Sequence, residues 1–316
     1  MRSRTASAQT LIAMILAACM ASPASAQTKP PATPSEATLT AKMNAYVGCI
    51  NRLSERSYSS RSRYFSWAKP SGPTGKERII YGTYTIYDTS DCRKNVESAN
   101  TLEPRDAELE AAGSAYAEAV GKLEPLLKET DDYYTQENYK DDKMAKGKAL
   151  HPQLVAAWDA FARADKDLRR NVEIINDKRA LERLAEIERS EGRKSRYHVE
   201  ALMIQAKRVL RTQNTDKPDL AAVTQALGDY EAAIKGVEDI ANTDGQKIGS
   251  MFTGNAKSFL TSAKQLMRRL RDKTPYSQGD KMMINAGSGW MIEGSPERLL
   301  RDYNQLIEAY NRGARI

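Results

Sequence analysis

Apolar side chains recur along this chain in alternating steps of three and four residues, and this spacing strongly restricts its fold. Residues spaced in this way fall on one face of an α-helix, where they can be buried against a neighbour. The longest series runs through Leu39, Met43, Tyr46, Ile50, Leu53, Ser57, Ser60, Tyr64 and Trp67. Further segments with the same alternation begin at Leu109, Leu154, Leu220, Phe252 and Leu299.

The predicted fold is therefore all-α: an elongated antiparallel helical bundle with long helices, forming a single domain over residues 38–316. Ser295–Pro296 is typical of an N-cap followed by Pro at the first helical position, and Glu103–Pro104 is expected to open a helix in the same way. Residues 153–212 form either one very long helix or two, hinged near residues 190–192.

Three long connections do not follow the helical pattern, namely Pro70–Thr89, Asp131–His151 and Thr274–Ser295. Long loops inside a domain are often functional, and aromatic rings in them can stack on sugars or aromatic compounds. Alternatively, these side chains only close the ends of the bundle. The candidate ligand residues are Tyr81, Tyr84, Tyr87, Asp131, Asp132, Tyr133, Asp141, Asp142, His151 and Trp290.

Residues 1–26 have the three parts of a secretory signal peptide. Arg2 and Arg4 give a positive start, Leu11–Ala21 is apolar, and Ala24–Ala26 provides an A-x-A cleavage site before Gln27. The apolar run is shorter than the roughly 20 residues that a permanent transmembrane helix needs. We therefore expect the protein to be exported.

A lipoprotein signal over residues 1–18 is the alternative to cleavage before Gln27. Leu16–Cys19 has the pattern of a bacterial lipobox, in which the thiol of Cys19 carries a lipid that tethers the chain to a membrane. Residues 27–37 are rich in Pro, Ala and Thr and suit a linker under either cleavage. The expected location is periplasmic, either soluble or lipid-anchored.

Two cysteines, Cys49 and Cys92, remain in the folded part under either cleavage. In an oxidising compartment the default expectation is a disulfide between them, with a free thiol or a metal pair as alternatives. Closing a loop of about 43 residues stabilises a fold by up to roughly 4 kcal/mol on the chain-entropy estimate.

Charge is mixed along the chain: 48 Lys and Arg against 41 Asp and Glu give a net charge of +7. This pattern indicates a charged surface and not a nucleic-acid-binding arm, and export also argues against DNA or RNA as a partner. The densest basic stretch, Arg268–Lys273, stands at a predicted helix end, where cations complement the helix dipole. Attraction to anionic lipid or cell-wall polymer is the alternative interpretation.

No motif for catalysis, haem or phosphate binding occurs in the sequence. The two histidines, His151 and His198, have no partner at metal-ligand spacing, and we expect both to be solvated. The acids between Asp131 and Asp142 lack the calcium-loop pattern, so Asp141 or Asp142 is better interpreted as a helix N-cap. We therefore expect no catalytic residues, no metal and no cofactor.

Five stretches carry a resemblance to a known family: "AYVGCINRLSERSYSSRSRYFSW", "GPTGKERIIYGTYTIYDTSDC", "DDKMAKGKALHPQLVAAWDAF", "KTPYSQGD" and "GSGWMIEGSPERLLRDYNQLIEAYN". With them the chain resembles the YiiG family of bacterial envelope proteins, some of them lipoproteins, built on a domain of unknown function. The resemblance spans nearly everything after residue 38. It implies an exported, envelope-associated helical protein and favours a lipid on Cys19. It provides no catalytic residues.

Three functions follow from these observations. The first is a non-enzymatic interaction or structural protein of the cell envelope with a protein partner. The second is a small-ligand or metal binder whose site lies in the three connections. The third is a cell-wall hydrolase that uses an acid pair which no sequence motif reveals.

Overall fold

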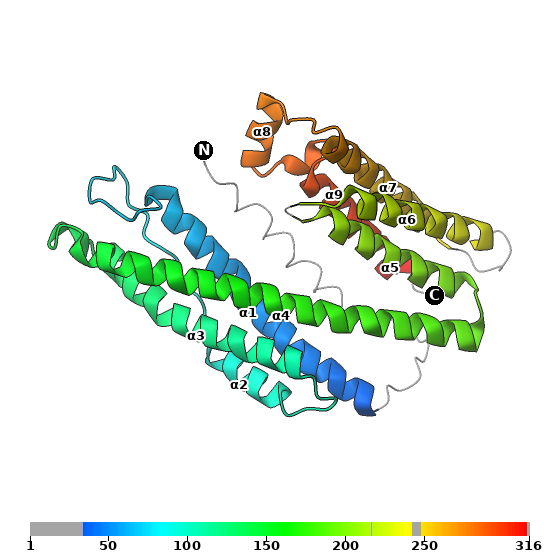
Figure 1. Ribbon diagram of the computed structural model, residues 1–316, viewed down its shortest axis with the longest axis horizontal. Coiled ribbons are helices and arrows are strands. Elements are labelled where there is room, and N and C mark those ends of the chain that lie inside the picture. Colours follow the sequence, from blue (N-terminus) through cyan, green and yellow to red (C-terminus); the bar gives the residue numbers. More distant parts are fainter. Residues whose placement is uncertain (1–33, 216, 242–247, 315–316) are drawn as a thin grey trace. The chain divides into compact units, whose positions relative to one another are not determined.

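The computed structural model describes residues 34–215, 217–241 and 248–314, and its regular structure is helical throughout (Figure 1). The α-helices in these ranges are α1 (Pro34–Trp67), α2 (Ser90–Ala99), α3 (Ala107–Thr135), α4 (Ala145–Glu191), α5 (Ser195–Gln213), α6 (Leu220–Ala241), α7 (Ser250–Arg271), α8 (Gln278–Asn285) and α9 (Pro296–Ala309). Short 3-10 turns cover Asn138–Lys140 and Gly289–Met291, and a π-helical turn covers Tyr310–Ala314. The all-α prediction is confirmed.

The signal peptide, Cys19 and the cleavage site before Gln27 lie outside the described residues. Residues 34–37, which were expected to belong to a linker, form the first turn of α1, where Glu36 complements the helix dipole. None of the described helices combines the length and apolar character needed to cross a bilayer.

The described chain divides into two compact units, one up to Asn176 and one from Asp177 onwards. The boundary falls inside α4, so this helix contributes to both units. The spacing predicted one domain over residues 38–316, because helical periodicity continues across the boundary without a break. Each unit has its own buried apolar residues and is described by itself.

The first unit contains α1, α2, α3 and the part of α4 up to Asn176. Every position of the predicted α1 series from Met43 to Tyr64 is at most 3% exposed, as the spacing requires. A Cβ atom at Gly113 of α3 would overlap the ring of Tyr46, so glycine permits the close approach of α1 and α3 at this level.

In the second unit, the end of α4 and α5 form an antiparallel pair. Gly192 adopts a left-handed backbone conformation (φ 79°) and ends α4, which resolves residues 153–212 into two helices. Ion pairs join the two helices at Arg183–Glu200 (3.0 Å) and Asp177–Lys207 (3.0 Å).

Aromatic rings from α6, α7 and α9 form the centre of the second unit. The ring of Phe259 lies 5.4 Å from Tyr230 and 5.5 Å from Tyr303, centroid to centroid. The buried hydroxyl of Tyr230 donates a hydrogen bond to the carbonyl of Ala256 (3.1 Å), which satisfies its polar atom inside the core.

One of the two predicted helix starts is confirmed and the other is wrong. Ser295 caps α9 by accepting a hydrogen bond from the amide of Arg298 (3.0 Å), with Pro296 as the first helical residue. Glu103–Pro104 does not open a helix. The carboxylate of Asp106 accepts the amide of Leu109 (2.9 Å), so α3 begins at Ala107 instead.

The connections contain more helix than the sequence indicated. Helix α3 continues to Thr135, because Tyr133 and Tyr134 are buried (2% and 6% exposed) and extend its apolar face. The second connection therefore shrinks to residues 136–144. Helix α2 was not anticipated, and the third connection includes α8.

Candidate functional site

Residues 79–89, called here the strap, follow α1 in sequence and run back along it without regular structure (Figure 1). Side chains of α1 hold the strap by its backbone. Arg63 Nε donates to the carbonyl of Tyr81 (2.8 Å), and Arg56 Nε donates to that of Thr85 (3.0 Å). Between them, Ser60 Oγ donates to the carbonyl of Tyr84 (2.6 Å). The irregular backbone is thus fixed by one helix face.

At the centre of the strap, Tyr84 contacts two arginines of α1. The guanidinium carbons of Arg56 and Arg63 lie 4.1 and 4.4 Å from the ring centroid of Tyr84. Arg63 Nη1 also donates to the Tyr84 hydroxyl (3.0 Å). Such cation–π contacts fix the ring and both guanidinium groups in one arrangement.

Three large apolar side chains of the strap face solvent. Ile79 is 51% exposed, Tyr81 48% and Tyr87 60%. Arg63 lies 5.7 Å from the ring centroid of Tyr81, and Arg52 lies 5.8 Å from that of Tyr87. The strap therefore presents an exposed tyrosine towards each end, each with an arginine of α1 beside it.

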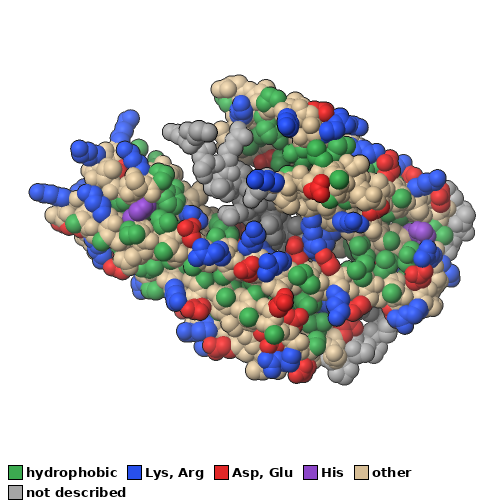
Figure 2. Space-filling view, in the orientation of Figure 1, with side chains coloured by type: hydrophobic (Ala, Val, Ile, Leu, Met, Phe, Trp, Pro, Cys, Tyr) green, Lys and Arg blue, Asp and Glu red, His purple; other side chains and the backbone are tan. Residues whose placement is uncertain are grey.

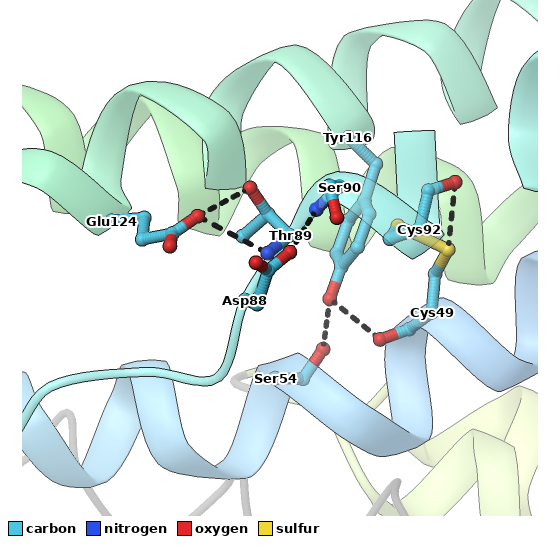
Figure 3. The surroundings of a disulfide bond; sticks show 8 residues. All are labelled: Cys49, Ser54, Asp88, Thr89, Ser90, Cys92, Tyr116 and Glu124. Carbon is cyan, nitrogen blue, oxygen red and sulfur yellow. Dashed lines mark hydrogen bonds between the residues drawn. A yellow bond between two sulfur atoms is a disulfide. The ribbon is translucent and has the colours of Figure 1, made fainter. Parts of the chain in front are cut away.

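The end of the strap is fixed to α3 and leads into the disulfide (Figure 3). Glu124 accepts hydrogen bonds from the amide (3.1 Å) and the hydroxyl (2.6 Å) of Thr89. Helix α2 starts at the next residue, and its Cys92 is bonded to Cys49 of α1 with the Cα atoms 5.1 Å apart. The predicted disulfide is confirmed, so neither cysteine is a free thiol or a metal ligand.

Asp131, near the end of α3, belongs to the surroundings of the strap. Partial burial raises the pKa of its carboxyl, and the neighbouring Asp132 raises it further, while Arg63 and Arg56 oppose the rise. Asp132 itself is exposed. Asp131 thus lies in α3 and not in a connection, and it shares the electrostatic influence of Arg56 and Arg63 with the strap.

Asp142 caps the start of α4. The sequence predicted that either Asp141 or Asp142 would do so. Its carboxylate accepts the amides of Ala145 (3.2 Å) and Lys146 (2.9 Å), together with the hydroxyl of Tyr133 (2.8 Å). These hydrogen bonds lower the pKa of Asp142, while burial and the contact with Asp142 raise the pKa of Tyr133 to about 12. The exposed Asp141 takes no part in this cap.

His151 is half-buried and both its ring nitrogens contact protein groups, whereas the sequence predicted a solvated side chain. It lies inside α4, stacked on the ring of Tyr64 with centroids 5.8 Å apart. Its Nδ1 is 3.0 Å from the Tyr64 hydroxyl, and its Nε2 is 3.2 Å from the carbonyl oxygen of Pro70. A neutral ring protonated on Nε2 satisfies both contacts, so this histidine ties the start of the first connection to α4.

Trp290 belongs to the second unit and is 44% exposed, with Arg301 5.3 Å from its ring centroid. It therefore lies in a different unit from the other candidate residues.

No catalytic constellation is evident among the described residues. A shallow groove of about 570 Å³ lies between α3 and α4, lined by Ala119, Gly121, Lys122, Pro125, Leu126, Ala156, Ala157 and Ala160. None of its lining residues is a carboxylate or belongs to the three connections. Within the described ranges, no group of three or more His, Cys, Asp or Glu side chains is placed to hold a metal ion.

The sequence candidates did not include the α1 residues that hold the strap, namely Arg52, Arg56, Ser60 and Arg63. Their spacing could have indicated them, because steps of four, four and three place all four side chains on one helix face. Only the folded chain shows that the strap lies on that face.

The described residues define a disulfide-bonded all-α protein with a fixed, tyrosine-bearing strap. The family described as "Protein of unknown function (DUF3829)" matches residues 37–312, and the chain belongs to this family. The chain is also 37% identical over 298 residues to the uncharacterized protein YiiG of Escherichia coli (strain K12), over 91% of this chain and 84% of that protein. The resemblance to the YiiG family is thus confirmed. No solved structure matches the chain.

Proposed function

We propose that this protein is exported to the cell envelope and acts by binding a protein partner, not by catalysis. The observation that carries the proposal is the strap, whose exposed Tyr81 and Tyr87 lie beside arginines of α1. Tyrosine and arginine dominate the residues that contribute most to protein–protein binding. Because the strap is fixed to α1, binding a partner orders few additional groups.

Catalysis and small-ligand binding have less support. The exposed strap tyrosines lie on an outer face, and the groove between α3 and α4 is not lined by them. A sugar-binding or hydrolytic site needs convergent polar groups in a concave pocket. The strap offers exposed side chains on a helix face, and such a surface suits a large partner.

A photo-crosslinking amino acid at position 87, introduced in the producing cells, tests the proposal. We expect a discrete cross-linked species containing a second protein. The same amino acid at Ile174, which is 53% exposed on α4 of the same unit, is the matched control and should give no such species. Arg52→Ala should reduce the yield at position 87 several-fold, because Arg52 lies beside this position and is proposed to contact the partner itself.

Cross-linking at neither position, or equally at both, would contradict the proposal that the strap binds a protein partner. The export part of the proposal is tested separately, by the mass of the protein purified from its producing cells. Export predicts a chain beginning at Gln27, or a di- or triacylated chain beginning at Cys19. A chain that still begins at Met1 would refute it.

A further inference from the structure

The second unit exposes a group of large apolar side chains on α8 and the 3-10 turn that follows, called here the α8 platform (residues 278–291). Met282 is 67% exposed, Met291 53% and Trp290 44%. Contiguous exposed apolar side chains of this size commonly mark a surface that contacts another molecule.

Helix α8 contributes nothing to the core of its own unit. None of its residues is buried, and its principal contacts are with the turn at Gly289–Met291. It is nevertheless a well-formed helix, because Ser277 and Asp280 form a reciprocal capping box (2.9 and 3.1 Å). Met282 is therefore presented to solvent by a well-formed helix, with Met283 and Ile284 half-buried beside it in sequence.

The base of the platform is fixed to α7. Arg269 donates to the carbonyls of Pro275 (3.2 Å) and Glu293 (3.0 Å), which joins the two ends of the connection. Its guanidinium carbon lies 4.4 Å from the ring centroid of Tyr276, whose hydroxyl donates to the carbonyl of Gly294 (3.1 Å). The segments that flank the platform in sequence are thus held together and fixed to α7 by Arg269.

Lys and Arg side chains lie in the same region, and Figure 2 shows them intermingled with hydrophobic side chains over α8 and the adjoining end of α7. Four acids lie near the platform: Asp272 is paired with Arg271 (2.8 Å), Asp280 is engaged in the capping box, Glu293 is exposed, and the carboxyl of Glu297 lies against Gly289. Arg268, Lys273 and Lys281 make no ion pair with any described carboxylate. Three cations can therefore contact an anionic surface.

We propose that the α8 platform docks on the surface of an anionic lipid bilayer. Trp290, Met282 and Met291 would enter the interfacial layer, where tryptophan is favoured, and Lys273 and Lys281 would contact anionic headgroups. The unpaired cations favour an anionic membrane over a neutral one or a second copy of this basic chain. This docking concerns the second unit and does not depend on a partner for the strap.

The test is sedimentation of the full chain carrying Cys19→Ser, so that no lipid can be attached there, with vesicles of two compositions. We expect binding to vesicles of phosphatidylcholine and phosphatidylglycerol at 3:1 and little to phosphatidylcholine alone. Binding should weaken as salt is raised from 50 to 500 mM. Lys273→Glu with Lys281→Glu should weaken it about tenfold or more.

The matched control is Lys194→Glu with Lys235→Glu, which changes charge equally. Both residues are exposed and lie towards the start of α7. The ion pair of Glu238 with Lys257 joins the end of α6 to the start of α7, and the ring of His198, near the start of α5, lies against Gly236 of α6. The control should bind as the parent does. Equal weakening by both pairs, equal binding to both vesicle types, or no binding would overturn the proposal.

Insertion has its own readout, since Trp290 is the most exposed of the three tryptophans and Trp158 is 1% exposed. Brominated phosphatidylglycerol should quench tryptophan emission, and Trp290→Phe should abolish most of this quenching while sedimentation persists. Met282→Ser with Met291→Ser should reduce sedimentation about tenfold. Self-association that depends on the same methionines, without vesicle binding, would assign the platform to a second copy instead.

Discussion

At the scale of single residues, the first unit contains a lysine that is fully buried. Lys42 is 0% exposed, and its ammonium group donates to the carbonyls of Leu102 (3.1 Å) and Pro104 (2.9 Å) and to Glu110 (2.5 Å). Glu110 also pairs with Arg105 (2.7 Å). A buried charge is tolerated only when paired and hydrogen-bonded, so these acceptors are what allow Lys42 to lie there.

Glu110→Gln should therefore lower the free energy of unfolding at pH 7 by about 3 kcal/mol, because it leaves the ammonium of Lys42 buried without its counter-charge. Chemical denaturation of both proteins measures this. The matched control is Glu118→Gln on the same helix, where the carboxylate pairs with exposed Lys122 (2.5 Å). That change should have little effect.

The same pair of proteins should differ in their pH dependence. Hydrogen bonds from Arg105 and Lys42 lower the pKa of Glu110 below its ordinary value of 4.5. The stabilisation is therefore complete above that pH and is lost as the pH falls towards the lowered value. The stability gap between the parent and Glu110→Gln should narrow between pH 5 and pH 2, and a constant gap would contradict this assignment.

At the scale of elements, the disulfide holds a short helix that the rest of the fold contacts along one face. Helix α2 buries Cys92, Val96 and Ala99, and the strap that precedes it has no regular structure. The bond to Cys49 therefore fixes the far end of the strap as well as α2 itself.

Replacing both cysteines, Cys49→Ser with Cys92→Ser, should lower stability by up to about 4 kcal/mol, through the entropy regained by the unfolded chain. Hydrogen exchange should accelerate first in α2 and the strap. Reductant added to the parent should reproduce the effect once the buried bond becomes accessible. Unchanged exchange in α2 would mean that packing alone holds this helix.

At the scale of the whole molecule, each unit buries its own apolar residues, and a polar network lies inside the first. Asp165 is 3% exposed and accepts hydrogen bonds from Ser54 (2.5 Å), Tyr58 (3.1 Å) and Arg169 (2.9 Å). The network joins α1 to α4. Because the second unit has no part in it, damage to the network tests whether the units unfold separately.

Asp165→Asn should destabilise the first unit by about 3 kcal/mol, since Arg169 loses its buried counter-charge. Hydrogen exchange should rise in α1 and α3 while α6 and α7 stay protected. The control is Asp167→Asn, whose exposed carboxylate lies 3.4 Å from Arg170. This change should alter neither the stability of the first unit nor hydrogen exchange in either unit. An equal rise in both units would show that residues 38–316 unfold as one domain.

The sequence by itself determined the helices and most of what they bury. Helical periodicity is a local property, so the burial of the α1 series from Met43 to Tyr64 follows from the spacing alone. The spacing is ambiguous where a step of three or four is equally acceptable: after Leu123 in α3 it allows either Leu126 or Leu127, and the structure buries Leu127. The pairing of Cys49 with Cys92 followed from the expectation that export removes Cys19 from thiol chemistry, which leaves two cysteines in the folded part.

Only the tertiary structure decided which distant side chains meet. The contacts of Arg63 with Tyr84, His151 with Tyr64, and Lys42 with Glu110 join residues 21, 87 and 68 positions apart. No spacing rule links such positions, because each contact depends on how whole helices pack. The burial of Asp165 and the exposure of Trp290 were decided in the same way, since a side chain's surroundings come from neighbours that the local sequence does not contain.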